Sequence, residues 1–278
     1  MSDWFYGDKT IIDRIGGAFV LGKFELYDCV RSDVFSISPV HGRSAVHVDR
    51  DYNFTSIKGS GWSFGGPLVL QSPKDPELYF GLYGQKVGIR EVDVSNRLRS
   101  AGIRCGRSSA LTLIADESYR ELCFLNGSRV NPALLYTEIL YPLRVADLAF
   151  LDPIDRLLAI SEAGEKMKFI FNSARDFVIE FICALADTVQ NIHRLGGVYD
   201  SLTYDNVTLA AEIVDFEWFY LPGFPNPDGS TDQELCQRQK KVKIYIIEVS
   251  YQLAALLNVD LSFFEIESVI LDRFPADF

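Results

Sequence analysis

The hydrophobic pattern of the chain changes its period along the sequence, and this change constrains the fold more than any other feature. Residues 15–125 carry short runs of β-branched and aromatic residues separated by Gly, Asp and Asn, as is typical of strands. One segment, Val87–Ala101, instead has apolar residues three or four positions apart and is followed by Gly102, which predicts a single helix. The predicted strands are Ala18–Tyr27, Ser44–Val48, Phe54–Lys58, Leu68–Gln71, Leu78–Leu82, Ser109–Ile114 and Tyr119–Leu125.

The second half of the chain is predicted to be mainly helical. The apolar residues of Ser173–Leu195 recur on one stripe, and Lys240–Leu257 and Leu261–Phe274 are further amphipathic segments. Between these helices, Val207–Leu221 has the composition of a strand and Phe224–Asp232 that of a loop.

Together these elements predict an α+β fold in two lobes. Residues 1–130 would form a strand-rich lobe with one helix, and residues 131–278 a helical lobe. A cleft between two such lobes is a natural place for a ligand.

Composition narrows the class of protein. The chain has 278 residues, of which 48% are hydrophobic, so it can bury a substantial core. Its formal net charge of −11 argues against nucleic acid as a partner. The five cysteines include no C-x-x-C pair, so we expect reduced thiols and neither a zinc site nor a disulfide framework. With no signal peptide and no membrane-spanning segment in the pattern, we expect a cytoplasmic protein without a membrane partner; export as a bacterial effector is the alternative.

A lysine at a strand end is the first candidate for binding a nucleotide. Lys58 closes the segment Phe54–Lys58 and precedes Gly59 and Gly61, which would form a flexible turn. Glu91 lies on the only helix predicted in this half. In protein kinases a strand lysine is paired with a helix glutamate and contacts the phosphates of ATP, so Lys58 and Glu91 could form such a pair.

A second group of candidates follows the long helix in the second half. Asp205 and Asn206 precede a short apolar run that ends at Asp215. An amide oxygen and a carboxylate are suitable ligands for Mg²⁺, which usually takes one or two protein groups together with phosphates and water. Protein kinases place a catalytic Asp five residues before this Asn, but Ser201 occupies that position here. Asp200 and Asp205 are the alternative bases.

Taken together, these segments resemble the selenoprotein O family of protein adenylyltransferases, which have a kinase-like fold. The similarity runs in order through residues 41–220 and keeps the spacing from Asn206 to Asp215 without a gap. The matching segments are Ile57–Gly61 (IKGSG), Ile89–Ile103 (IREVDVSNRLRSAGI), Asp116–Glu121 (DESYRE), Arg144–Ala146 (RVA), Ala174–Asp176 (ARD) and Leu202–Asp215 (LTYDNVTLAAEIVD).

The resemblance implies an activity: transfer of AMP from ATP to a hydroxyl group of a protein or small molecule. It implies that Lys58 and Arg144 contact the nucleotide, with Glu91 orienting Lys58. It implies that Asn206 and Asp215 hold Mg²⁺ or Mn²⁺, and that Asp205 is the base.

Two departures from the family leave other functions open. The family has a second arginine seven residues after Arg144, where this chain has Leu151, and His41 replaces an acidic residue of a glycine-rich loop. Loss of that arginine favours transfer of the γ-phosphate, which would make the protein a kinase. A nucleotide-binding pseudokinase without turnover is the third possibility.

Overall fold

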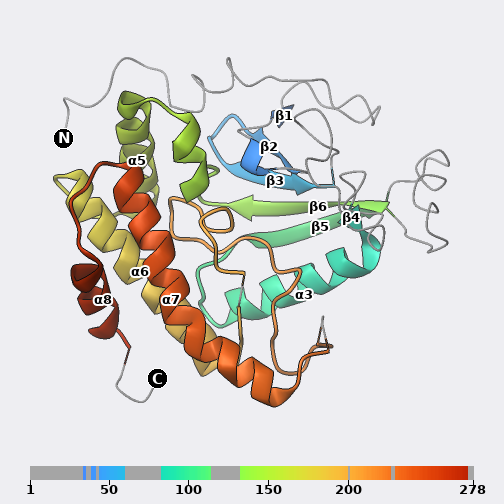
Figure 1. Ribbon diagram of the computed structural model, residues 1–278. Coiled ribbons are helices and arrows are strands. Elements are labelled where there is room, and N and C mark those ends of the chain that lie inside the picture. The colour runs from blue at the N-terminus through green and yellow to red at the C-terminus, as the bar shows by residue number, and fades with distance from the viewer. Residues whose placement is uncertain are drawn as a thin grey trace. The chain divides into compact units, whose positions relative to one another are not determined.

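The computed structural model describes residues 34–35, 39–41, 44–59, 83–113, 132–199, 201–226 and 229–274, which form two compact units (Figure 1). The sheet unit consists of the described residues up to Asn96 together with Arg107–Pro142. The helical unit consists of Arg97–Gly106 and the described residues from Leu143 onward. An antiparallel sheet in the N-terminal part and helices in the C-terminal part confirm the α+β prediction. Four predicted strands lie outside the described residues, namely Ala18–Tyr27, Leu68–Gln71, Leu78–Leu82 and Tyr119–Leu125.

The sheet unit is organised around its last strand. Its strands are β1 (Val34–Phe35), β2 (Ser44–Val48), β3 (Phe54–Lys58), β4 (Tyr83–Gly84), β5 (Arg107–Leu113) and β6 (Pro132–Ile139), and a short 3-10 helix, η1 (Pro39–His41), precedes β2. Every pairing is antiparallel. Leu135 of β6 pairs with Lys58 of β3 on one edge and with Leu111 of β5 on the other, which makes β6 an interior strand. The strands predicted at Ser44–Val48 and Phe54–Lys58 form with the predicted bounds.

Strand β6 lies just past the predicted division of the chain. The sequence analysis ended the strand-rich lobe at residue 130, yet β6 begins at Pro132 and belongs to the sheet unit. The helical unit also takes in Arg97–Gly106, which the sequence analysis placed in the first lobe. Pairing with β3, β4 and β5 defines the PALLYTEI segment as a strand, whereas its local pattern did not mark it as one.

The predicted helix of the first half is α3 (Gln85–Ser100). It packs on the sheet through small residues: a Cβ on Gly88 would lie 2.4 Å from a methyl group of Leu111, and the Ser95 hydroxyl accepts a 2.9 Å hydrogen bond from the Ser108 N–H. Gly102 ends the helix with φ at +74°, a conformation that favours glycine. Figure 1 shows α3 running alongside β5. The helix therefore fixes where Glu91 lies against the sheet.

Among its described residues from Leu143 onward, the helical unit contains a 3-10 helix and four α-helices. They are η2 (Val145–Phe150), α5 (Pro153–Met167), α6 (Ala174–Arg194), α7 (Asp232–Leu256) and α8 (Phe263–Leu271). Helices α6, α7 and α8 pack against one another. Within the described part of the chain, no helix has the length and apolar character needed to cross a membrane.

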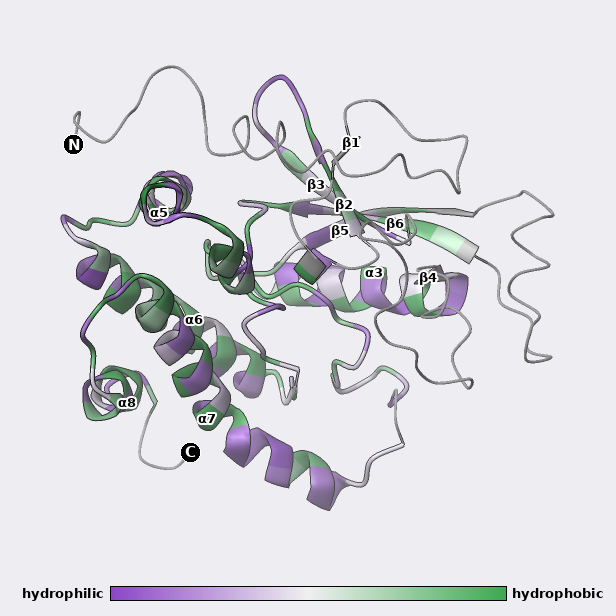
Figure 2. Ribbon diagram, turned by 45° about the horizontal axis from the view of Figure 1, so that its top comes forward, coloured by the Kyte–Doolittle hydropathy of each residue, from purple (hydrophilic) through white to green (hydrophobic). Residues whose placement is uncertain are grey.

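The three helices predicted in this half are confirmed, with one shifted start. The predicted stripe of α6 is fully buried, from Phe177 at the first turn to Ile192 at the last. Helix α7 begins eight residues before the predicted Lys240, because Thr231 and Glu234 form a capping box at its start. Figure 2 shows the first turns of α7 as hydrophilic, which explains why an apolar pattern did not reveal them.

The strand predicted at Val207–Leu221 is wrong. The segment makes only isolated bridges, such as Val207 with Ile213 and Val198 with Tyr220, and otherwise runs in turns. Ala211 and Asp215 adopt positive φ angles of 51° and 76°, which a regular strand does not allow. The apolar run is buried as a folded loop in the core of the helical unit.

Candidate functional site

Lys58 and Glu91 form a buried ion pair in the sheet unit. The Lys58 ammonium donates to both carboxylate oxygens of Glu91, at 3.0 and 3.1 Å. Lys58 is 7% exposed and Glu91 is 1% exposed. Lys58 is the last residue of β3, and Glu91 lies in the second turn of α3, so the strand and the helix each contribute one charge.

The burial of this pair has an energetic consequence. Removing two charges from water costs several kcal/mol per ion, and their attraction often only offsets that cost. An apolar pair of the same size would stabilise the unit about as well. Stability alone therefore does not account for Lys58 and Glu91, whereas a function that needs an oriented ammonium does.

Gly59 lets the chain turn immediately after the lysine. Its φ is +85°, and a Cβ on this residue would lie 2.5 Å from the Ala133 carbonyl oxygen and 2.8 Å from the Tyr83 Cβ. Only glycine fits such a close approach without displacing main-chain atoms. Gly61, the other glycine predicted to bind the nucleotide, lies outside the described residues.

Tyr83 is a third member of this group that sequence reasoning missed. Its hydroxyl donates a hydrogen bond to Oε2 of Glu91, and its ring lies 5.2 Å from the Lys58 ammonium. The side chain is fully buried. In the sequence it is one of 13 tyrosines at the end of an aromatic run, and no spacing marks it.

The helical unit contains a second group of predicted residues on the loop between Tyr204 and Phe216. Main-chain hydrogen bonds tie this loop to the start of η2: Val145 N–H donates to Val207, Ala146 N–H to Tyr204, and the Leu209 N–H to Leu143, at 2.8–3.0 Å. Two segments about 60 residues apart in the sequence are thereby held together.

Arg144 strengthens this connection with its side chain. Its Nη1 donates a 2.8 Å hydrogen bond to the Asp205 carbonyl oxygen. Its main-chain N–H donates a 2.6 Å bond to the Asp147 carboxylate, which caps η2. Arg144 is 8% exposed, so this guanidinium directly orders the Asp205–Asn206 turn.

Asn206 and Asp215 lie at the two ends of the buried loop. The Val214 N–H donates a 3.0 Å hydrogen bond to the Asn206 carbonyl oxygen. Asp215 therefore directly follows the residue that is bonded to Asn206. The Asn206 side-chain amide donates from Nδ2 to the Ser201 carbonyl at 3.1 Å, and this orients its Oδ1 away from that bond. Asp215 is partly exposed, and its Oδ1 accepts a 3.4 Å bond from the Glu217 N–H.

The side-chain oxygens of Asn206 and Asp215 could supply only part of the ligands of a metal ion. Among the described residues, no group of three or more His, Cys, Asp or Glu side chains could hold a metal ion. Asn206 and Asp215 supply at most an amide oxygen and a carboxylate. Such a donor set suits Mg²⁺ that keeps water and binds phosphate, and it does not suit a metal held by protein groups alone.

A buried carboxylate on the same loop was also missed. Glu212 is 1% exposed, and its main-chain N–H donates to the Thr208 hydroxyl at 3.3 Å. Burial lowers the pKa of the Arg104 guanidinium, and the charge of Glu212 acts in the opposite direction.

Two further positions from the sequence analysis are Leu151 and Asp200. Leu151, where the family has an arginine, is 7% exposed and forms the C-cap of η2. Asp200, the alternative base, lies outside the described residues. The predicted residues thus divide into two groups in separate units: Lys58, Gly59 and Glu91 in the sheet unit, and Arg144, Asp205, Asn206 and Asp215 in the helical unit.

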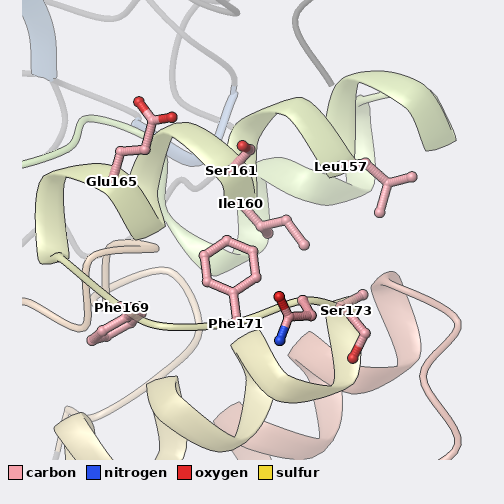
Figure 3. A pocket seen from close by; sticks show the side chains of 9 residues that line it. Leu157, Ile160, Ser161, Glu165, Phe169, Phe171 and Ser173 are labelled. Atoms are coloured by element: carbon pink, nitrogen blue, oxygen red, sulfur yellow. The ribbon is translucent and has the colours of Figure 1, made fainter. Parts of the chain in front are cut away.

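A separate pocket of about 220 Å³ lies in the helical unit (Figure 3). It is formed by α5 from Leu157 to Glu165, the connection to α6 and the first residue of α6. Figure 3 shows the Phe171 ring reaching from this connection toward α5, where its edge packs on Gly164. None of the predicted site residues lines this pocket.

No protein-family model matches the chain, and no curated protein is significantly similar to it.

Proposed function

We propose that this protein is an ATP-dependent transferase that moves AMP from ATP to a hydroxyl acceptor. The observation that carries the proposal is the buried Lys58–Glu91 ion pair between a strand and a helix. Such a pair orients a lysine toward phosphates in kinase-like enzymes. The resemblance to the selenoprotein O family supports the same reading, because the paired residues stand at its matching positions.

The second support is the loop that carries Asn206 and Asp215. Its backbone is fixed by the main-chain bonds to Leu143 and Val145, so the two side chains are held on a rigid support. A divalent cation on these oxygens would neutralise charge on the phosphates when bound. Arg144 would contribute by holding the turn at Asp205 in place.

The chain's own residues would act mainly by position and charge. Lys58 would neutralise a phosphate oxygen, and Glu91 would keep the ammonium in place. Asp205 would accept the proton of the acceptor hydroxyl while the oxygen of that hydroxyl forms the new bond to the α-phosphorus of ATP. The bond from that phosphorus to the bridging oxygen breaks, and pyrophosphate leaves.

A kinase is the second candidate, and Leu151 favours it. This residue is buried and apolar where the family has its second arginine, so it cannot pair with a phosphate. The resemblance implies an orientation of ATP in which the α-phosphate faces the acceptor, and without the second arginine that orientation loses part of its support. In that case the acceptor oxygen attacks the γ-phosphorus, and ADP leaves.

Paired labelling separates these functions. The protein is incubated with Mg²⁺ or Mn²⁺ and with ATP labelled at the α or the γ position, using the protein itself and a cell lysate as acceptors. Label from the α position alone supports AMP transfer, and label from the γ position alone identifies a kinase. Nucleotide binding by calorimetry without any transfer identifies a pseudokinase, and absence of binding overturns the proposal.

Matched lysine variants connect the result to the site. Lys58→Met should abolish transfer, whereas Lys86→Met should not, because Lys86 is exposed on the first turn of α3. Equal activity of the two variants would remove Lys58 from the site.

A further inference from the structure

Tyr83 contacts every described residue predicted to bind the nucleotide in the sheet unit. Its hydroxyl bonds to Glu91, its ring lies beside the Lys58 ammonium, and its Cβ fills the space next to Gly59. These three contacts come from three parts of one side chain.

The backbone of Tyr83 is fixed on both sides. Tyr83 pairs with Ala133 of the interior strand β6, and Gln85, two residues on, begins α3, which carries Glu91. The ring is completely buried. The backbone of Tyr83 is thus held by the sheet, while the hydroxyl at the far end of its side chain bonds to Glu91 of α3.

The hydroxyl changes what Glu91 can do to Lys58. The carboxylate accepts two bonds from the ammonium and one from Tyr83, so part of its negative charge is compensated by a neutral donor. Hydrogen bonds to charged groups are about twice as strong as those between neutral groups. Without the hydroxyl, Glu91 would attract the ammonium more strongly and would also be freer to rotate.

We propose that Tyr83 is a positioning residue for ATP: its hydroxyl holds Glu91 so that Lys58 can be shared with a phosphate. This inference rests on the proposed function, because it assigns Tyr83 to the same nucleotide. Tyr83 does not itself contact the phosphates and acts through Glu91.

Kinetics of a double-mutant cycle test the proposal. Tyr83→Phe keeps the ring and removes the hydroxyl, and we expect kcat/KM for ATP to fall about tenfold, mainly through KM. In a Glu91→Gln background the same change should cost no more than about threefold, because the bond then goes to a neutral amide. Equal effects in both backgrounds would overturn a role through Glu91.

A second measurement needs no nucleotide. Lys58 is acetylated with acetic anhydride and quantified by peptide mass spectrometry against exposed Lys86 as the internal reference. Tyr83→Phe should slow acetylation of Lys58 at least about threefold, because Glu91 then holds the ammonium more tightly. In the Glu91→Gln background the difference should disappear. An unchanged rate in Tyr83→Phe would overturn the proposal.

The two measurements keep the proposals apart. If the wild-type protein binds no ATP but the acetylation result holds, the proposed function fails and the coupling of Tyr83 to Lys58 stands. Tyr141→Phe is the matched control, since Tyr141 is 1% exposed in the same unit and packs its ring on Phe54. This variant should leave Lys58 acetylation unchanged, and thermal unfolding of each variant checks that it is folded.

Discussion

The Nη1 atom of Arg144 and the carbonyl oxygen of Asp205 are joined by a 2.8 Å hydrogen bond across 61 residues of sequence. The bond lies where η2 begins and where the loop carrying Asn206 turns. The bond gives Arg144 a structural role, because it holds the Asp205–Asn206 turn in place. Contact with phosphate, which the resemblance implies for the same residue, remains a prediction.

Removal of this bond should loosen the turn. Arg144→Ala is expected to lower the free energy of unfolding by about 1.5–3 kcal/mol, since a charged donor is lost from a part-buried hydrogen bond. Amide hydrogen exchange should accelerate at Ala146 and Val214, whose N–H groups bond to this loop. Arg107→Ala is the control, because its ion pair with Glu138 is half exposed, and it should cost under about 1 kcal/mol. Unchanged amide hydrogen exchange at Ala146 and Val214 in Arg144→Ala would contradict this structural role of Arg144.

Asp215 should be required for metal-dependent activity and not for folding. Asp215→Asn suits the test because asparagine tolerates the φ of 76° at this position. We expect transfer to fall at least about a hundredfold, with an unchanged thermal midpoint, because a charged ligand to the cation is lost. Asp260→Asn, an exposed change in the same unit, should retain full activity. Normal turnover by a folded Asp215→Asn protein would refute the assignment of the metal ligand.

Gly59→Ala should be more damaging than a positive φ alone explains. Gly59 has φ at +85°, and the Ala133 carbonyl oxygen and the Tyr83 Cβ lie within 3 Å of an added Cβ, whereas Gly102 has φ at +74° and nothing within 4 Å. Gly102→Ala should therefore cost about 1 kcal/mol from backbone strain alone. Gly59→Ala should cost at least about 2 kcal/mol more, measured by urea denaturation. Similar midpoints for the two variants would argue against the close approach at Gly59.

His193 should make stability depend on pH. Burial lowers the pKa of His193 from its ordinary 6.5 to about 4, and the charge of Lys243 adds to this effect. The folded protein therefore keeps this side chain neutral while the unfolded chain takes up a proton. Stability is fully present above pH 6.5 and is lost as the pH falls from 6.5 toward 4. At pH 5 the loss relative to pH 7 should be about 2 kcal/mol from this residue.

Urea denaturation at pH 7 and pH 5 measures this loss. His193→Gln should reduce the difference between the free energies of unfolding at the two pH values. An identical pH dependence in His193→Gln and the wild type would contradict the role of His193.

Cys105 should be unreactive in the folded protein. Burial raises the pKa of its thiol to about 12, while Cys236 is exposed on α7. Iodoacetamide at pH 8 should alkylate Cys236 at least about a hundredfold faster than Cys105, because the thiolate is the reacting species. Peptide mass spectrometry gives both rates, and urea should abolish the difference. Rapid alkylation of Cys105 in the native protein would show that this part of the core opens.

Local pattern predicted the elements whose burial follows a simple period. The strand Phe54–Lys58 and the helix α6 are found where alternation or a helical stripe indicates them. Helix α5 was not predicted, although Asp152 and Pro153 form a standard helix start: the Asp152 carboxylate accepts bonds from two main-chain N–H groups. The N-cap residue Asp152 and the proline that follows it are therefore the sequence signals that indicate α5.

The site depended on tertiary structure to different degrees. Lys58 and Glu91 were predicted as a pair, and the ion pair is confirmed. Tyr83 was missed because a hydroxyl on an aromatic side chain gives no periodic signal. The apolar run after Asn206 has the composition of a strand, but positive φ angles at Ala211 and Asp215 fold it into a loop. Bonds to Leu143 and Val145, far away in the sequence, stabilise that shape.

The interior place of β6 has a consequence for how the protein is made. This strand is the last of the sheet to leave the ribosome, yet β3 and β5 both pair with it and not with each other. The edges of β3 and β5 that face β6 therefore wait unpaired until Pro132 emerges, a state prone to aggregation. Strands β1, β2 and β3 can pair with one another earlier, but the sheet is completed only when residues 132–139 emerge, which makes this short segment the step that times completion of the sheet during translation.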